Sequence, residues 1–148
     1  MQDPREKLQA ALKDAMKNKD TQRRDVLRLL QSAIKQVEID TRNELSADAV
    51  IDVLQKEAKK RRESIADYEK AGRADMAEAE RKELAVIEEF LPRQLTQEEI
   101  TAIVREVIAE VGAESPQDIS KVMGPVMARV KGVADGKLVN QIVRQELA

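Results

Sequence analysis

The sequence predicts an all-α protein, with a helical N-terminal domain of about four helices and a small three-helix C-terminal domain. Strong helix formers, chiefly Ala, Leu, Glu, Lys, Gln and Arg, dominate the 148 residues. The five glycines and four prolines fall mainly between segments whose apolar residues recur at helical spacing. No segment shows the sustained alternation of apolar and polar residues that marks a half-buried strand.

The first forty residues predict two helices. We expect the first over residues 3–17, because Asp3 suits the N-cap and Pro4 suits the first helical position. We expect the second over residues 21–40. The apolar stripe of the first helix is formed by Leu8, Ala11, Leu12, Ala15 and Met16. The core side of the second is formed by Val26, Leu27, Leu30, Ala33, Ile34 and Val37.

Two longer helices are expected next. The third starts after Ser46, a favourable N-cap, and runs to about Ala71, where Gly72 can end it in the left-handed conformation. The fourth runs over residues 74–90 and ends before Pro92, because the residue preceding a proline is forced out of the helical region. Tyr68 and Phe90, which are the only aromatic residues, are both expected in the core.

The C-terminal part predicts three shorter helices. Thr96 and Glu99 have the spacing of a capping box, and the helix they start is expected to stop near Gly112. Ser115 followed by Pro116 is a second start signal. We expect the pair Gly124–Pro125 to kink or break the helix that follows. Asp135 is expected to cap the last helix.

Proline and charge together suggest where the chain divides. Long, highly charged helices precede Pro92, and shorter, more apolar helices follow Leu95. We therefore predict two helical domains, residues 1–92 and residues 96–148, joined by a linker near Pro92.

The composition excludes several kinds of chemistry. The chain has no Cys and no His, so it has no thiol nucleophile, no thiolate metal site and no imidazole base. It has no glycine-rich phosphate-binding loop of the nucleotide-binding type. The sequence therefore predicts no catalytic residue, no cofactor and no metal. No segment has the length and apolarity of a signal peptide or a membrane span, so we expect a soluble, cytoplasmic protein.

One basic residue falls on the apolar side of its predicted helix. Arg61 lies within the apolar arc of the third helix, and Glu80 and Glu83 lie within that of the fourth. Glu57, one turn before Arg61, is a third candidate partner. The favoured interpretation is a partly buried structural ion pair, and the alternative is a functional carboxylate cluster.

Two sets of cations are candidates for contact with phosphate. Arg24, Arg28 and Lys35 lie within a narrow stripe of the second helix, opposite its apolar side. The second set surrounds the turn at Gly132 and Gly136, whose backbone amides and following helix start could also hold a phosphate. This set comprises Lys121, Arg129, Lys131 and Lys137. The alternatives are a solvated helix face for the first set and a simple chain reversal for the turn.

Several motifs together resemble one protein family. In the C-terminal half they are residues 122–127, 131–136 and 139–143. In the N-terminal half they are residues 27–30, 33–35, 60–65 and 71–73, with Tyr68, Glu80, Glu83 and Leu91–Pro92. On these motifs the sequence resembles the YqeY family along nearly its whole length.

The resemblance implies a helical N-terminal domain followed by a three-helix domain. The latter is similar to the tail domain of the B subunit of tRNA-dependent Asp/Glu amidotransferases, which contacts tRNA. Proteins of this kind carry the label of carbon–nitrogen ligase activity with glutamine as amido-N-donor. Glutamine hydrolysis requires an activated nucleophile, and this sequence lacks both Cys and the Ser/Lys pattern of an amidase.

Three functions remain open at this stage. The first is a non-catalytic tRNA- or RNA-binding accessory module that uses the cations named above. The second is an adaptor that binds a protein partner through an exposed apolar patch near Met123 and Met127. The third is an amidotransferase subunit whose nucleophile comes from a partner chain. The oligomeric state is not predicted.

Overall fold

The computed structural model describes residues 3–148. Over that range it contains seven α-helices, one short 3₁₀ turn and no strand, which confirms the predicted all-α class. The chain divides into two compact units, the first ending at Leu91 and the second running from Pro92 to Ala148. Each unit has its own apolar core.

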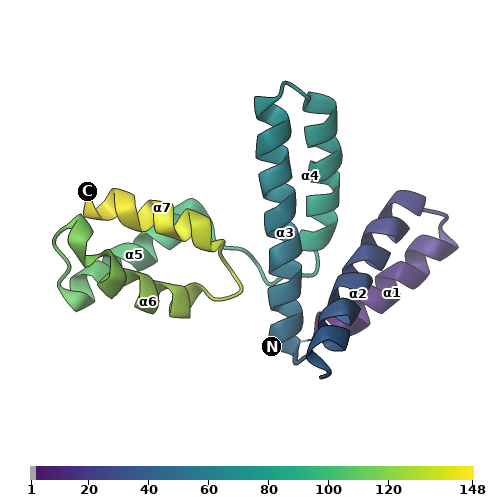
Figure 1. Cartoon of the computed structure of the whole chain (residues 1–148), viewed down its shortest axis with the longest axis horizontal. Coiled ribbons are helices and arrows are strands. Elements are labelled where there is room, and N and C mark those ends of the chain that lie inside the picture. The colour runs from purple at the N-terminus through teal and green to yellow at the C-terminus, as the bar shows by residue number, and fades with distance from the viewer. Residues whose placement is uncertain (1–2) are drawn as a thin grey trace. The chain divides into compact units, whose positions relative to one another are not determined.

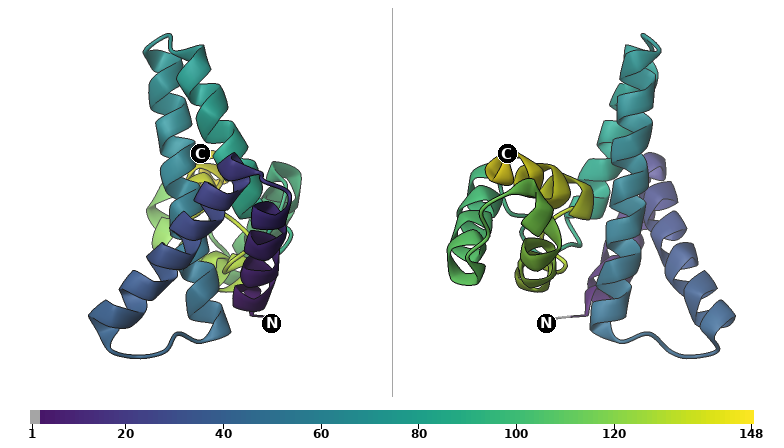
Figure 2. Two further views of the ribbon diagram at one scale, coloured as in Figure 1. Left: turned by 90° about the vertical axis from the view of Figure 1, so that its right-hand side faces the viewer. Right: turned by 60° about the vertical axis from the view of Figure 1, so that its left-hand side comes forward.

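The first unit consists of two helical hairpins. Its helices are α1 (Pro4–Lys17), α2 (Thr21–Thr41), α3 (Ala47–Lys70) and α4 (Ala74–Glu88). In Figure 1, α1 lies beside α2 and α3 lies beside α4, and Figure 2 shows the same pairing from two further sides. The core includes Leu8, Leu27, Leu30, Ile34, Val50, Leu54 and Ile87.

The predicted caps of this unit are present. The Asp3 carboxylate accepts the backbone N–H of Arg5, and Pro4 follows at the first turn of α1. The Ser46 hydroxyl accepts the N–H of Ala49 at 3.2 Å. Gly72 has a φ of 70°, the left-handed conformation that ends helices at low cost for glycine.

α4 is shorter than predicted, because it ends at Glu88 and not at Phe90. The N–H groups of Phe90 and Leu91 bond to carbonyls three residues earlier, so the chain tightens into a narrower turn. Phe90 and Leu91 are only 5% and 8% exposed and belong to the first core. The last turn before Pro92 thus places two apolar side chains in the core without continuing the helix.

Two apolar side chains are less buried than the sequence predicted. Helical spacing predicts Met16 on the apolar stripe of α1, but 52% of its surface is exposed. Its sulfur lies 3.8 Å from the guanidinium of Arg28, so the side chain covers a basic residue on α2. Tyr68 is half-buried and lies outside the core cluster, whereas Phe90 is buried as expected.

The second unit is a three-helix bundle. Its helices are α5 (Gln97–Val111), α6 (Ile119–Val130) and α7 (Gly136–Leu147), with a 3₁₀ turn, η1 (Pro116–Asp118), before α6. Each of the three helices packs against the other two (Figure 1). The core is formed by Ile100, Val104, Val107, Val122, Val126, Val130, Val139, Ile142, Val143 and Leu147.

The predicted capping box starts α5. The Thr96 hydroxyl accepts the N–H of Glu99, and the Glu99 carboxylate accepts the N–H of Thr96. Arg93 also holds Glu99 through two hydrogen bonds of 2.9 and 2.7 Å. The hydrogen bonds from Arg93, followed by the backbone bond from Thr96, lower the pKa of Glu99 from 4.5 to about 2.

Of the kink or break expected at Gly124–Pro125, the break does not occur, since α6 runs continuously from Ile119 to Val130. Pro125 lacks an N–H and therefore leaves the carbonyl of Lys121 without its helical donor. Both residues lie on the exposed side of α6, where water can take the place of that donor.

The start signal at Ser115 also acts differently from the prediction. Pro116 begins the 3₁₀ turn and not α6 itself, and the Ser115 side chain makes no cap hydrogen bond. Asp118 closes this turn, because its carboxylate accepts the N–H of Glu114 at 2.9 Å. By contrast, the Asp135 carboxylate accepts the N–H of Lys137 at 3.3 Å and caps α7 as predicted.

Thr96 and Ser115, the two residues predicted to start helices of the second unit, should differ in how much their mutation lowers its stability. Thr96→Ala removes a cap hydrogen bond and should lower the free energy of unfolding of this unit by about 1 kcal/mol. Ser115→Ala should leave it within about 0.5 kcal/mol, since that hydroxyl caps nothing. Amide hydrogen exchange in α5 of the intact chain measures both. Equal effects of the two substitutions would contradict the assignment of the cap.

Glu99 predicts a specific pH dependence. Its pKa is lowered in the folded chain, so its charge stabilises the fold above 4.5, its ordinary value, and this contribution is lost as the pH falls towards about 2. Glu99→Gln should therefore destabilise α5 at neutral pH, and the difference from the wild type should shrink below pH 4.5 and vanish near pH 2. Exchange rates of the α5 amides across that pH range test this. A difference independent of pH would show that the charge is not involved.

Candidate functional site

The structure brings Arg61 together with all three of its candidate partners. Its Nε lies 2.8 Å from Oε2 of Glu83 and 3.6 Å from Oε2 of Glu80, both on α4. Its Nη1 lies 3.4 Å from Oε2 of Glu57, one turn earlier on α3. The cluster thus joins the two helices of the second hairpin.

Because the side chains of this cluster are largely buried, the charges of its carboxylates must be balanced by Arg61 and not by water. The side chains of Arg61 and Glu57 are 11% and 10% exposed. Lys60 adds a second positive charge at 3.3 Å from Glu57, whereas Oε2 of Glu80 is buried and accepts no hydrogen bond. Within residues 3–148, no group of three or more acidic side chains is arranged so that it could hold a metal ion. The geometry is that of a structural ion cluster between helices.

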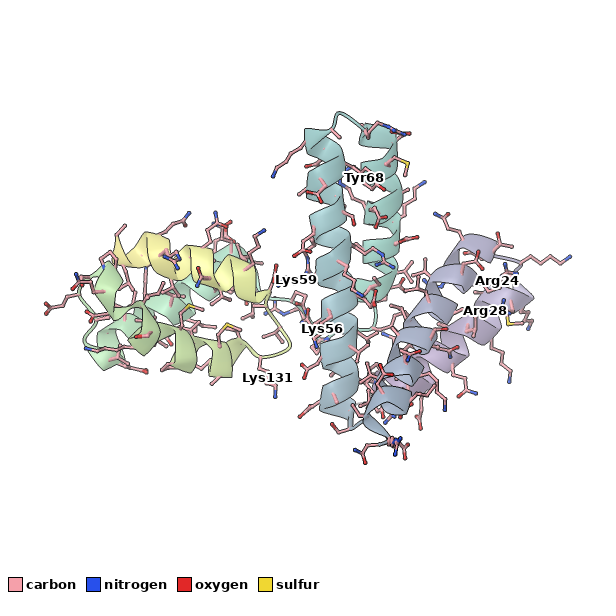
Figure 3. All side chains as sticks on the ribbon, in the orientation of Figure 1. Arg24, Arg28, Lys56, Lys59, Tyr68 and Lys131 are labelled. Carbon is pink, nitrogen blue, oxygen red and sulfur yellow. The ribbon has the colours of Figure 1, made fainter. Side chains whose placement is uncertain are left out.

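The three cations predicted on α2 have different surroundings. Arg24 pairs with its neighbour Asp25 at 3.0 Å. Arg28 is exposed and contacts the sulfur of Met16. Lys35 is exposed and forms no ion pair with any residue of the described range. Figure 3 shows Arg24 and Arg28 on the first hairpin.

The four cations predicted in the C-terminal unit fall into two pairs. Lys121 and Arg129 are neutralised, the first by Asp118 at 3.4 Å and the second by Glu106 at 2.8 Å. Lys131 and Lys137 are exposed, and neither forms an ion pair within the part of the chain that the structure describes. Lys131 is labelled in Figure 3 at the turn that follows α6.

The turn that carries these two lysines is fixed by residues that the sequence did not single out. The Gln94 side-chain amide donates to the carbonyls of Pro92 and Gly132, at 2.8 and 3.2 Å. The N–H of Leu95 donates to the carbonyl of Val133 at 2.8 Å. Gly132 has a φ of 78°, a conformation open to glycine. The segment before α5 therefore holds the turn in one shape.

The start of α7 is less suited to a phosphate than the sequence suggested. Asp135 already accepts the N–H of Lys137, so one of the amides expected to bind an anion has an internal partner. The carboxylate also places a negative charge at the positive end of the helix dipole. The side chains of Lys131 and Lys137 remain as the groups able to meet an anion here.

The methionines proposed for an adaptor surface are not an exposed patch. Met123 and Met127 are half-buried and pack against the second core. The Asn140 amide contacts the sulfur of Met123. A groove of about 430 Å³ lies instead in the first unit, between α2 and α3. Its apolar lining is formed by Ala33, Val37, Leu45, Ala49 and Val53.

The ion cluster predicts a large cost when its cation is removed. Arg61→Met removes the cation shared by Glu57, Glu80 and Glu83 and should destabilise the first unit by about 3 kcal/mol. Adding Glu57→Gln, Glu80→Gln and Glu83→Gln should recover most of that loss, because the three negative charges that Arg61 faced are then gone. Urea unfolding of the intact chain measures each variant.

Arg81→Met is the matched control for this experiment. Arg81 also joins α4 to α3, through Glu69, but both side chains are about half exposed. Its loss should cost no more than about 1 kcal/mol. An Arg61 variant as stable as the Arg81 variant would show that the cluster does not hold the hairpin together.

Comparisons with known proteins agree with the sequence motifs. The family model described as Yqey-like protein matches residues 5–147. A relative from Kluyveromyces lactis, named "Altered inheritance of mitochondria protein 41, mitochondrial", is 32% identical over 124 residues, which are 80% of this chain and 66% of the relative. Proteins of the same name from Pyrenophora tritici-repentis and Lachancea thermotolerans are 28% and 33% identical. Those matches cover 94% and 74% of this chain, and 78% and 60% of the respective relatives.

The relatives correct one prediction. We predicted a cytoplasmic location from the sequence, and this is contradicted by the relatives, each of which is named as a mitochondrial protein. None of the helices in residues 3–148 combines the length and the apolar character needed to cross a bilayer.

The family resemblance predicted from the motifs is confirmed over almost the whole chain. Because the family model covers residues 5–147, the chain belongs to the Yqey-like protein family.

Proposed function

We propose that this protein is a non-catalytic RNA-binding accessory module whose C-terminal unit contacts the phosphate backbone of tRNA. Lys131 and Lys137 are the residues that make the contact. The proposal is supported by the resemblance of this unit to the tail domain of the tRNA-dependent amidotransferase B subunit. It gives the unit a contact role and leaves any amidotransferase chemistry to another chain.

The observation that carries the proposal is the difference between the paired and unpaired cations of this unit. The side chains of Lys121 and Arg129 are held by acidic neighbours, whereas those of Lys131 and Lys137, on either side of a turn, form no ion pair in the described range. The turn itself is pinned by Gln94. Two exposed charges at a fixed turn can meet a polyanion without first breaking an ion pair.

The composition favours phosphate contacts over base stacking. Residues 92–148 contain no aromatic residue. Bases of single-stranded RNA usually stack on aromatic or guanidinium planes, and such a platform of rings is lacking here. Binding should therefore depend strongly on salt and only weakly on base sequence.

The proposal also assigns no catalytic step to this chain. Glutamine-dependent amide transfer needs a nucleophile activated by a base, and the chain has neither Cys nor His. A carbon–nitrogen ligase that includes this protein would take its nucleophile and its nucleotide site from a partner. The purified chain should therefore bind tRNA without hydrolysing glutamine.

Titration of total tRNA into the intact protein at several salt concentrations tests the proposal. We expect an association constant whose logarithm falls linearly with the logarithm of the salt concentration. Lys131→Gln together with Lys137→Gln (K131Q/K137Q) should reduce that slope by about 1.4 to 1.8, since each phosphate contact contributes about 0.7 to 0.9.

A matched control comes from α3. Lys59 and Lys70 are exposed and form no ion pair in the described range, so K59Q/K70Q removes the same net charge elsewhere. This variant should keep the wild-type slope. If K59Q/K70Q lowers the salt slope as much as K131Q/K137Q does, binding depends only on the overall charge of the protein and not on Lys131 and Lys137. No binding of tRNA at low salt would refute the proposal and favour the adaptor.

A further inference from the structure

A second basic surface lies on the first hairpin, on one side of α1 and α2. Arg28 of α2 reaches across to the sulfur of Met16 on α1. Lys13 lies one helical turn before Met16, and Lys35 lies two turns after Arg28. We name Lys13, Arg28 and Lys35 the α1–α2 basic face.

The cations of this face are available to an incoming anion. Lys13, Arg28 and Lys35 are exposed, and within residues 3–148 none of them forms an ion pair. Two acids that flank the stripe on α2 are already engaged. Asp25 pairs with Arg24 at 3.0 Å, and Glu38 pairs with Arg5 at 3.4 Å.

The spacing of the cations fits a polyanion better than a single small anion. Lys35 lies seven positions after Arg28 on the helix, a rise of about 10 Å. In a stacked nucleic-acid strand, successive phosphates are about 3.4 Å apart along the axis, so a distance of about 10 Å corresponds to about three nucleotides. Lys13 on the neighbouring helix widens the surface.

A small pocket adjoins the face. It has a volume of about 210 Å³ and lies between α1 and α2. Leu8 and Ile34, both almost fully buried, form its apolar floor. Gln9, Gln31 and Lys35 are among its other lining residues, together with the Arg5–Glu38 pair.

The lining suits the edge of a nucleobase. A glutamine amide offers both a donor and an acceptor, as base edges do. Bases can enter such a pocket only from single-stranded segments, loops or bulges, because in an RNA duplex they are stacked and paired. The cations at the rim would lie beside the phosphates of the same strand.

We infer that the α1–α2 basic face is a second RNA-contact surface that holds an unpaired nucleotide, with its phosphates on Arg28, Lys35 and Lys13 and its base in the Gln9–Gln31 pocket. This inference rests on the proposed function, since it concerns the same RNA. It adds a place in the N-terminal unit where single-stranded RNA is distinguished from a duplex.

An anionic membrane is the less suitable partner for this surface. Helices that lie in a bilayer interface present a broad apolar side with Trp, Phe or Leu. The large exposed apolar residues beside the basic face are Met16 on α1 and Ile39 on α2, one turn after Lys35, and two such residues do not make a broad apolar side. Glutamine amides and a base-sized pocket give no advantage at a lipid surface.

Three variants of the intact protein test the inference with two probes, a short single-stranded RNA and the same strand in a duplex. Arg28→Gln with Lys35→Gln (R28Q/K35Q) should reduce the salt slope for the single strand by about 1.4. Gln31→Leu should leave the slope unchanged and reduce the preference for the single strand about fivefold, the loss expected from about 1 kcal/mol of hydrogen bonding. K59Q/K70Q should behave as the wild type. Melting curves confirm that each variant is folded.

The outcomes separate this inference from the proposed function. If K131Q/K137Q weakens binding and R28Q/K35Q does not, the second surface is refuted and the proposed function stands. An unchanged strand preference in the Gln31 variant would refute the nucleotide pocket. If vesicles of anionic lipid bind the wild type but not R28Q/K35Q, while RNA binding is equal in both, the face is a membrane contact and the inference is overturned. A wild-type protein that binds neither probe but binds tRNA refutes this inference alone, and one that also fails to bind tRNA refutes the proposed function as well.

Discussion

The first unit depends on one cation placed between two helices. Arg61 faces three carboxylates, of which Glu57 is almost buried and Glu80 has a buried oxygen that accepts no hydrogen bond. Such a cluster fixes the register of α3 against α4, because sliding either helix would separate buried charges at high cost. The register in turn sets where Ile87 of α4, and Phe90 just after it, enter the core shared with α1 and α2.

The fold could largely be predicted because its signals are local. Caps, left-handed glycines and the capping box each act within four residues, and the structure contains them at Asp3, Gly72 and Thr96. The errors have a common cause. Whether Pro125 breaks a helix depends on whether its orphaned carbonyl faces water, which is a property of packing and not of the dipeptide. Met16 was misplaced because helical spacing does not reveal that Arg28 lies across from it.

The site was less predictable because charge pairing is not local. Arg129 meets Glu106 from another helix, so a residue that looked free in the sequence is neutralised in the fold. Gln94 supports the turn at Gly132 across 38 residues, and no local pattern marks it. The angular positions on the helices did identify Arg61, Glu80 and Glu83, because each of these lies on the apolar side of its own helix. Glu57 followed from its place one turn before Arg61. The sequence therefore shows which residues lie on the core side of a helix, but it does not show with which residue each of them forms an ion pair.

The junction between the units has a consequence for any ligand that touches both. Leu91 is fixed in the first core, and the N–H of Leu95 is fixed to Val133 in the second unit. The four peptide steps between them span at most about 14 Å. For a ligand long enough to contact both units, the second contact is an intramolecular event whose gain in affinity depends on the length of this segment. Lengthening this short tether would weaken avidity while leaving each surface intact.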